Sequence, residues 1–261
     1  MKETALITGA TGGLGKELAK VHARAGGSLI LAGRSAEKLD SVKKELEAEY
    51  SVQIATVCAN LLDGNAAEEI FRQVQETGTE IEYLINNAGF GGRGEFHNRT
   101  MEQDMDMIRV NVITVTKLMK LFLPGFVARG HGRVLNVSST ASLMPGPLQA
   151  AYYATKAYVT SLGNAVWEEL REAGSAVTVT TLLPGGMNTG FIKASDMQNT
   201  KLFANAGDPA VVAKAGYESM LKGERNVIAG MDDSPEFLSQ LNALLPNEAL
   251  LRYVYEMQKE K

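Results

Sequence analysis

A short apolar segment, a run of glycines and a helical pattern follow one another at the start of this 261-residue chain. Residues 4–8 are typical of a buried strand, and apolar residues recur at helical spacing from Leu18 to Ala25. Between them stand Gly9, Gly13 and Gly15. Glycines let a backbone turn tightly and approach a pyrophosphate, whose charge the N-terminus of the next helix favours. This order predicts a dinucleotide-binding fold; the alternative is a glycine-rich turn that binds no ligand.

Strand-like and helical segments alternate along the whole chain. Further strands are predicted at residues 28–32, 52–57, 82–85, 133–137, 177–183 and 226–228. Strands that alternate with helices form a parallel sheet with helices on both faces. We therefore predict an α/β fold, a doubly wound parallel sheet of about seven strands (a Rossmann fold) in one domain over residues 1–261. Within it, residues 187–207 are expected to form a substrate loop and residues 235–258 a helical tail.

The residues after the second strand bear on the choice of cofactor. In nucleotide folds an acidic side chain about 20 residues after the glycine loop binds a free ribose 2′-hydroxyl, whereas an arginine accommodates a 2′-phosphate. Here Gly33 stands near that place, Arg34 is adjacent, and no acid occurs before Glu37. This pattern favours NADPH and leaves NAD possible. The alternative is that Arg34 is a surface residue next to a helix that Ser35 caps.

Apolar residues from Met101 to Phe126 recur in steps of three and four, which predicts one long amphipathic helix. Asn111 falls on this apolar stripe, three residues after Ile108 and four before Val115. A buried amide has to find hydrogen-bond partners. Asn111 is therefore either a satisfied structural residue that locally bends the helix or part of a polar site.

Tyr152 and Lys156 stand four residues apart, so that on a helix both side chains lie on the same face. An isolated phenol has a pKa of about 10. A nearby ammonium favours the phenolate, which would make Tyr152 usable for proton transfer near neutral pH. Taken alone, this spacing is more often a packed ring beside a solvated amine, so the pair needs support from other motifs.

Composition and charge exclude several kinds of partner. The net charge is −4 and no basic run occurs, which argues against a nucleic acid or an anionic membrane surface. The single cysteine, Cys58, cannot form an intrachain disulfide or a multi-cysteine zinc site, and we expect no metal. The N-terminus lacks the apolar core of a signal peptide, and no apolar run approaches the roughly 20 residues of a membrane span. We therefore expect a cytoplasmic protein without a membrane span.

Taken together, the motifs resemble those of the short-chain dehydrogenase/reductase family over nearly the whole chain. In that family a serine lies 13 residues before the tyrosine, and Ser139 stands 13 residues before Tyr152. The motifs that agree in order and spacing are Thr8-Gly9-x-x-x-Gly13-x-Gly15, Asn86-Asn87-Ala88-Gly89, Ser139 with Tyr152 and Lys156, and Pro184-Gly185 with Thr189.

The resemblance implies a role for each catalytic residue. Tyr152 would pass a proton to or from the substrate oxygen as general acid and base. Lys156 would lower the pKa of Tyr152 and bind the nicotinamide ribose, and Ser139 would hold the carbonyl oxygen. Asn111 matches the family's helix asparagine in a proton relay, which replaces its structural interpretation. Tyr153 and Ser138 would point away from the site.

The resemblance also implies a cofactor site. Asn87 would line the cleft and Thr189 would meet the carboxamide of the nicotinamide. Asn60 departs from the family, which commonly has an aspartate near the adenine ring at this place. The expected cofactor-binding residues are Gly9, Thr11, Gly12, Gly13, Leu14, Gly15, Arg34, Asn60, Leu61, Asn87, Ala88, Gly89, Tyr152, Lys156, Pro184, Gly185 and Thr189.

The function implied is a dehydrogenase that uses NADP or NAD to interconvert a carbonyl and a primary or secondary alcohol. Its substrate would be a medium-sized apolar ketone, aldehyde or 3-oxoacyl compound, because the expected wall is largely apolar. That wall would comprise residues 90–94, His97, residues 144–148, Met187, Phe191 and the segment to Phe203.

Two other functions stay open, a dinucleotide-binding regulator or scaffold without turnover and an epimerase or dehydratase of the same fold. The helices around Asn111 and after Tyr152 resemble those through which family members associate, so a homodimer or homotetramer is expected. From Asp232 onward the tail has six acidic and three basic residues, which suits a subunit contact or a cover over the site better than an anionic membrane.

Overall fold

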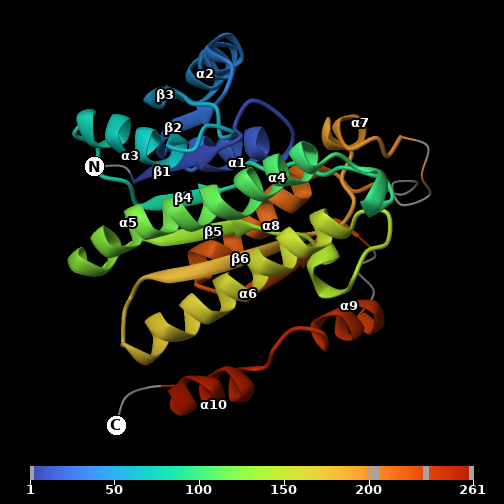
Figure 1. Ribbon diagram of the computed structural model, residues 1–261. Helices are drawn as coiled ribbons and strands as arrows, with labels where there is room; N and C mark the ends of the chain where they lie inside the picture. The colour runs from blue at the N-terminus through green and yellow to red at the C-terminus, as the bar shows by residue number, and fades with distance from the viewer. Residues whose placement is uncertain (1–2, 199, 201–205, 232–234, 259–261) are drawn as a thin grey trace.

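A seven-stranded parallel sheet forms the centre of the molecule in the computed structural model, which describes residues 3–198, 200, 206–231 and 235–258. The strand order is β3-β2-β1-β4-β5-β6-β7 (Figure 1). Seven parallel strands confirm the predicted sheet, although several ends move by one or two residues. The strands are β1 Thr4–Thr8, β2 Ser28–Gly33, β3 Ile54–Cys58, β4 Tyr83–Asn86, β5 Arg133–Val137, β6 Thr178–Pro184 and β7 Asn226–Ala229.

Helices cover both faces of the sheet because the strands bury apolar side chains in both directions. In β1, Ala5 and Ile7 face the cluster that α1, α2 and α8 complete, whereas Leu6 faces the cluster of α3, α5 and α6. The helices are α1 Gly13–Arg24, α2 Ala36–Tyr50, α3 Ala66–Glu76, α4 Met101–Ile108, α5 Val115–Arg129, α6 Ala150–Glu172, α7 Phe191–Ala194, α8 Pro209–Lys222, α9 Pro235–Asn242 and α10 Glu248–Gln258.

The order of the strands reverses between β1 and β4. Ile7 of β1 pairs with Leu31 of β2 on one side and with Ile85 of β4 on the other. Parallel strands end at the same edge, so the loops that follow β1, β2 and β4 meet there. Open α/β sheets bind ligands in the crevice at such a reversal.

The predicted long helix is not one continuous α-helix. A π-helical segment, Arg109–Thr114, separates α4 from α5, and the Thr114 hydroxyl donates to the carbonyl of Arg109 at 3.0 Å. Asn111 lies inside this segment, so the predicted local distortion occurs at the polar residue. Single-turn π segments of this kind are frequent at functional sites.

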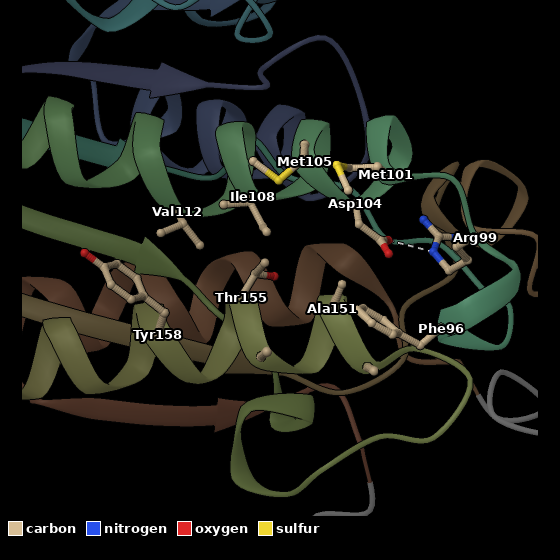
Figure 2. A pocket seen from close by; sticks show the side chains of 12 residues that line it. Phe96, Arg99, Met101, Asp104, Met105, Ile108, Val112, Ala151, Thr155 and Tyr158 are labelled. Carbon is tan, nitrogen blue, oxygen red and sulfur yellow. Dashed lines mark hydrogen bonds and ion pairs between the residues drawn. The ribbon is translucent and has the colours of Figure 1, made fainter.

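The first part of the predicted apolar stripe is exposed, contrary to expectation. Met101 is 80% exposed and Met105 40% exposed. Figure 2 shows these side chains and Ile108 on one wall of a groove of about 820 Å³, with Ala151 and Thr155 of α6 on the other wall. This first part of the stripe therefore faces a groove between α4 and α6 and not the sheet.

Residues 101–129 are long and apolar enough to cross a membrane by length and composition, which the sequence interpretation did not expect. The second half of this stretch packs on the sheet through buried residues of α5, among them Leu118, Phe122 and Phe126. A core helix passes the same test of length and composition. We therefore assign α5 to the cover of the sheet.

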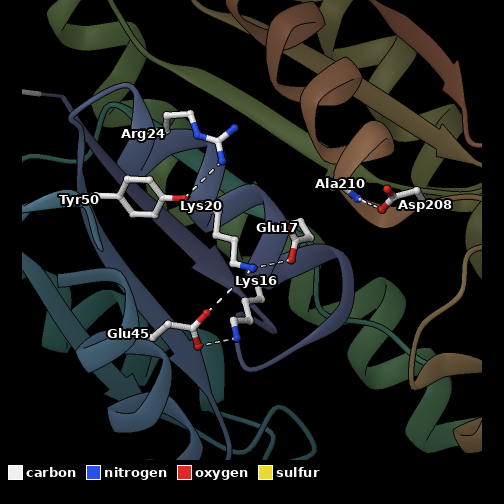
Figure 3. Close-up of polar contacts among 8 residues, drawn as sticks. All are labelled: Lys16, Glu17, Lys20, Arg24, Glu45, Tyr50, Asp208 and Ala210. Atoms are coloured by element: carbon white, nitrogen blue, oxygen red, sulfur yellow. Dashed lines mark hydrogen bonds and ion pairs between the residues drawn. The ribbon is translucent and has the colours of Figure 1, made fainter. Parts of the chain in front are cut away.

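Polar contacts support the helix ends and join neighbouring helices. The Lys16 ammonium of α1 lies 2.6 Å from a Glu45 carboxylate oxygen of α2, and Lys20 lies 3.9 Å from the same carboxylate (Figure 3). The Asp208 side chain accepts from the Ala210 N–H at 2.8 Å, which caps the helix predicted to begin there. Because these ion pairs are exposed, they contribute little to stability compared with the buried core.

The tail forms α9 and α10, as predicted. Helix α10 lies along α6 (Figure 1), and the Arg252 guanidinium lies 3.8 Å from the Glu172 carboxylate. Leu251 and Tyr255 are half-buried against the rest of the chain. The outer face of α10 exposes a row of apolar side chains, Leu250, Tyr253, Val254 and Met257.

Candidate active site

The glycine loop fits closely against the ends of β1 and β4. Gly9 has a φ of 68°, a left-handed conformation that favours glycine. At Gly15 an added Cβ would lie 2.3 Å from the Gly9 carbonyl oxygen and 2.4 Å from the Asn87 amide nitrogen. Any larger side chain at Gly15 would therefore push α1 away from the loop. A Cβ at Gly13 would lie 3.3 Å from the Cβ of Thr189, so the loop also borders that predicted residue.

Thr8 and Asn87 hold the end of β4 to the glycine loop. The Thr8 hydroxyl accepts from the N–H groups of Asn87 and Ala88, both at 3.1 Å. The Asn87 side-chain amide donates to the carbonyls of Thr8 at 2.9 Å and Gly9 at 3.3 Å. Thr8 was not among the predicted site residues, although its place directly before Gly9 could have indicated it.

The structure brings Ser139, Tyr152 and Lys156 together at the same edge of the sheet. Ser139 follows β5, and its hydroxyl lies close enough to the buried Tyr152 phenol to influence the pKa of that phenol. Tyr152 and Lys156 both project from α6, and the Lys156 nitrogen lies 5.8 Å from the centre of the Tyr152 ring. The Lys156 ammonium donates to the Val137 carbonyl at 2.9 Å. A phenol, a hydroxyl and an ammonium in this arrangement can hold an oxygen and exchange a proton with it.

Burial determines how these groups titrate. Desolvation raises the pKa of Tyr152 to about 12, and the hydrogen bond from Ser139 offsets only part of that rise. Desolvation lowers the pKa of Lys156 to about 8. The predicted lowering of the Tyr152 pKa by Lys156 is therefore wrong for this structure, because burial disfavours the phenolate and the Lys156 ammonium is bonded to the Val137 carbonyl.

Asn111 is buried, and its amide is fully used. Its side-chain oxygen accepts from the Phe90 N–H at 3.1 Å, and its nitrogen donates to the Phe90 carbonyl at 2.9 Å and the Thr155 hydroxyl at 3.1 Å. A Cβ added at Gly89 would lie 3.1 Å from the Asn111 oxygen and 3.4 Å from the Lys156 nitrogen. Asn111 therefore satisfies a structural role and also stands beside Lys156.

Two residues were predicted to contact the adenosine part of the cofactor, Arg34 and Asn60, and the structure leaves only the Arg34 side chain without partners among the described residues. Arg34 is exposed, and within the described residues its guanidinium has no hydrogen-bond or ion-pair partner. Asn60 is committed to its own turn, because its amide nitrogen donates to Asp63 at 3.2 Å and its oxygen accepts from the Leu62 N–H at 3.4 Å. Gly33 lies beside Thr11, whose methyl would be 3.2 Å from an added Cβ.

Of the two residues expected to point away from the site, Ser138 does so, whereas the Tyr153 ring packs edge-on against Tyr152, with ring centres 6.2 Å apart. The Ser138 hydroxyl donates to the Lys156 carbonyl at 2.9 Å and shares a 2.7 Å hydrogen bond with Thr160. Tyr153 packs its ring on Gly146, where an added Cβ would lie 2.4 Å from ring carbons. Ser138 thus belongs to the contact between β5 and α6, and Tyr153 belongs to the neighbouring loop.

Phe191 closes the substrate side of the site. Its ring centre lies 5.4 Å from that of Tyr152, and Phe90 packs in the same apolar cluster. The Ser139 hydroxyl donates to the Pro184 carbonyl at 3.4 Å, so the end of β6 lies beside Ser139. His97, predicted in this wall, has a side chain that is 78% exposed and lies 3.8 Å from Glu95. Leu202 and Phe203, also predicted here, lie outside the described residues.

A separate group of possible metal ligands lies away from this edge. Glu80, Glu82 and His131 place their ligand atoms within 4.8 Å of one another, before β4 and β5. His131 already bonds Glu82 at 2.7 Å, and the Arg129 guanidinium lies 3.5 Å from Glu80. These side chains are therefore already paired with one another, and the sequence interpretation did not identify the group.

The sequence of this chain is similar to those of known proteins. A family model described as short chain dehydrogenase matches residues 3–200. The chain is 35% identical over 190 residues to the very-long-chain 3-oxoacyl-CoA reductase of Homo sapiens, an alignment that covers 70% of this chain and 58% of the human protein. The matched region thus spans less than two thirds of that relative's length.

Solved structures show the same architecture. A short-chain dehydrogenase from Sphingobium yanoikuyae in complex with NADPH superposes with a TM-score of 0.82 at 26% identity, covering 99% of this chain and 97% of that one. A short-chain dehydrogenase/reductase from Burkholderia phymatum in complex with NAD superposes with a TM-score of 0.81 at 23% identity, covering 92% of each chain. The second likeness concerns the fold alone.

The low pKa of Lys156 predicts a pH-dependent contribution to stability. Its pKa is about 8 in the folded chain against an ordinary value of 10.5. Between these values the unfolded chain binds more protons than the folded one, so the unfolding free energy rises with pH. Relative to Lys156→Met, the wild type should gain about 2 kcal/mol between pH 7 and about pH 9.5 in urea unfolding.

The same comparison between about pH 5.5 and pH 7 is the control, because Lys156 is charged in both states there. The low pKa of Lys156 would be contradicted if the difference in unfolding free energy between wild type and Lys156→Met stayed constant above pH 8.

Proposed function

The chain belongs to the short-chain dehydrogenase/reductase family, and from that premise we propose that it interconverts a carbonyl and an alcohol with a nicotinamide dinucleotide. The observation that carries this proposal is the meeting of Ser139, Tyr152 and Lys156 beside the glycine loop. A regulator or scaffold would have no need of a buried lysine and a buried phenol on one face of α6. We therefore favour an enzyme over the non-catalytic alternative.

The residues around the cleft fit such a cofactor. A Cβ added at Gly12 would meet nothing within 4 Å among the described residues, so the backbone at the start of α1 is open to a pyrophosphate. Gly89 leaves room in front of Asn111 and Lys156, where a ribose would be held. When bound, the nicotinamide ring would supply or accept the hydride.

The side chains of the protein would transfer a proton between Tyr152 and the substrate oxygen. Ser139 and Tyr152 would each direct a hydroxyl at the substrate oxygen and stabilise the charge that develops on it. With a pKa raised to about 12, Tyr152 keeps its proton until that charge appears. The Lys156 ammonium, one turn along α6, would then stabilise the phenolate left after proton transfer.

A 3-oxoacyl thioester is the substrate class that we propose. Phe90, Phe191 and the buried Met197 give the substrate side an apolar lining that suits an acyl chain. The name of the human relative, very-long-chain 3-oxoacyl-CoA reductase, supports the same class. Medium-sized apolar ketones and aldehydes remain within the chemistry of the site.

NADPH is the cofactor that we propose to be preferred. Arg34 stands directly after β2 with an exposed guanidinium, and no acidic residue lies between β2 and Glu37. A free guanidinium there suits a ribose 2′-phosphate. The structural relatives bind either cofactor, NADPH in one and NAD in the other, so the proposal rests on Arg34.

We also propose that the chain works as a homo-oligomer. The groove between α4 and α6 exposes Met101, Met105 and Ile108 beside the small residues Ala151 and Ala154 (Figure 2). An apolar surface of this kind is typical of a subunit contact, and a second copy could place its own α4 and α6 there. The apolar outer face of α10, on the other side of α6, would extend that contact.

Removing the hydroxyl group of Tyr152 should greatly slow the reaction. We expect Tyr152→Phe to lower kcat for NADPH oxidation with a 3-oxoacyl thioester by about 10²- to 10⁴-fold, the share of a general acid. Tyr153→Phe is the matched control and should keep near wild-type turnover, because its ring packs on Gly146. Full activity in Tyr152→Phe, with cofactor bound, would refute the assigned role.

The cofactor preference can be tested at Arg34. Arg34→Ala should raise KM for NADPH by about 10- to 100-fold, since a charge-assisted hydrogen bond to phosphate is lost. The KM for NADH, which has no 2′-phosphate, should stay within about twofold and serves as the internal control. Equal changes for both cofactors would contradict the proposed contact.

Charge in the groove should break the oligomer. Met105→Glu places a carboxylate in the apolar groove, and we expect light scattering to show a smaller mass than the wild type at micromolar concentration. Val127→Glu, on the exposed face of α5 outside the groove, should leave the mass unchanged. A monomeric wild type would overturn the proposed assembly.

A further inference from the structure

Ser195 buries a hydroxyl that has no hydrogen-bond partner among the residues that the structure describes. The residue ends α7, where its N–H donates to the Phe191 carbonyl at 2.9 Å. It is only 1% exposed, and its side-chain oxygen makes no hydrogen bond within the described part of the chain. Buried hydroxyls are normally paired, so an unpaired one calls for an explanation.

The Ser195 hydroxyl converges with Tyr152 on one point of the site. A Cβ added at Gly91 would lie 2.8 Å from the ring tip of Phe191, 3.0 Å from the Ser195 oxygen and 3.3 Å from a ring carbon of Tyr152. Only the lack of a side chain at Gly91 lets these three groups come together. The unpaired hydroxyl therefore lies on the substrate side of the Tyr152 ring.

A second polar group near Tyr152 is poorly partnered. Gln149 stands one turn before Tyr152 at the start of α6, and it is buried. Its side-chain amide donates at 3.3 Å to the sulfur of Met197, which is a weak acceptor. Met197 lies two residues after Ser195, so both polar groups belong to the same contact between α6 and the segment after α7.

The other buried atoms without partners are elsewhere in the fold. Within the described residues they belong to Asn86, Arg129, Thr180, Thr181 and Arg225, which lie on or beside the sheet. Ser195 is the member of this group on the substrate segment. An alanine there would bury the same backbone without an unpaired oxygen, so packing alone gives no reason for the hydroxyl.

The chemistry of the two groups limits what they would bind. A hydroxyl and a carboxamide are neutral and can each donate one or more hydrogen bonds, which suits a carbonyl oxygen better than a carboxylate or a phosphate. A 3-oxoacyl thioester carries two carbonyl oxygens on alternate carbons. If Ser139 and Tyr152 hold the oxygen of the reacting 3-oxo group, the thioester carbonyl oxygen lies only two carbons away along the substrate.

We infer that Ser195, assisted by Gln149, binds the second carbonyl oxygen of a 3-oxoacyl thioester and so favours this class over simple ketones. The inference rests on the proposed function and makes Ser195 a specificity-determining residue. Phe191 shares the space in front of the hydroxyl, so a bound substrate displaces the Phe191 ring from Gly91.

The test compares two substrates in wild type and Ser195→Ala. One is a 3-oxoacyl N-acetylcysteamine thioester, and the other is a 2-ketone of the same chain length without the second oxygen; NADPH oxidation is followed. We expect kcat/KM for the thioester to fall about five- to tenfold in Ser195→Ala, the size of one neutral hydrogen bond. The value for the ketone should stay within about twofold, and the melting temperature should not fall, because the Ser195 hydroxyl makes no hydrogen bond to the described residues.

Controls separate this inference from the proposed function. Ser219→Ala removes another buried serine hydroxyl, on α8, and should leave the ratio of the two kcat/KM values unchanged. If wild type reduces neither substrate, the proposed function fails and the inference fails with it. If wild type reduces the thioester but Ser195→Ala loses nothing, or loses equally on both substrates, the inference alone is overturned.

Discussion

The pairing of β1 between β2 and β4 is the constraint on which the rest of the molecule depends. Residues 5–7 of β1 are fully buried, because the two apolar clusters cover this strand on both faces. Beyond the strand, the Gly9 N–H still donates to the Ala32 carbonyl of β2 at 2.9 Å, and the Thr8 hydroxyl receives two N–H groups from the end of β4. The cleft is therefore built mostly from backbone that the sheet itself holds in place.

A second set of contacts fixes the catalytic side chains relative to the sheet. Ser138 bonds the Lys156 carbonyl and Thr160, while the Lys156 ammonium bonds the Val137 carbonyl. These hydrogen bonds join the end of β5 to the middle of α6. Because Ser139 follows Ser138, and Tyr152 lies one turn before Lys156, the same contacts set the separation of the serine and tyrosine hydroxyls. Ser138 thus acts as a positioning residue although it points away from the site.

Local sequence patterns were sufficient for the fold and for much of the site, because both depend on short-range signals. The strand, the glycines and the helix that contain Gly9, Gly13 and Gly15 are adjacent in sequence, and Tyr152 and Lys156 are one helical turn apart. Where the outcome depends on tertiary surroundings, prediction was weaker. Spacing indicated that Lys156 lies beside Tyr152, but the direction of the Tyr152 pKa follows from how deeply the phenol is buried, which no local pattern reveals.

Ser195 shows the same limit in a sharper form. Nothing in the residues around it separates this serine from an exposed one, since its burial depends also on Gly91 and Tyr152, which lie far from it in the sequence. That its hydroxyl lacks a partner among the described residues is visible only in three dimensions. Active sites are where proteins retain polar groups that the folded chain alone does not satisfy, because a substrate completes the hydrogen bonding. The residues that choose a substrate are thus harder to read from sequence than the residues that perform the chemistry.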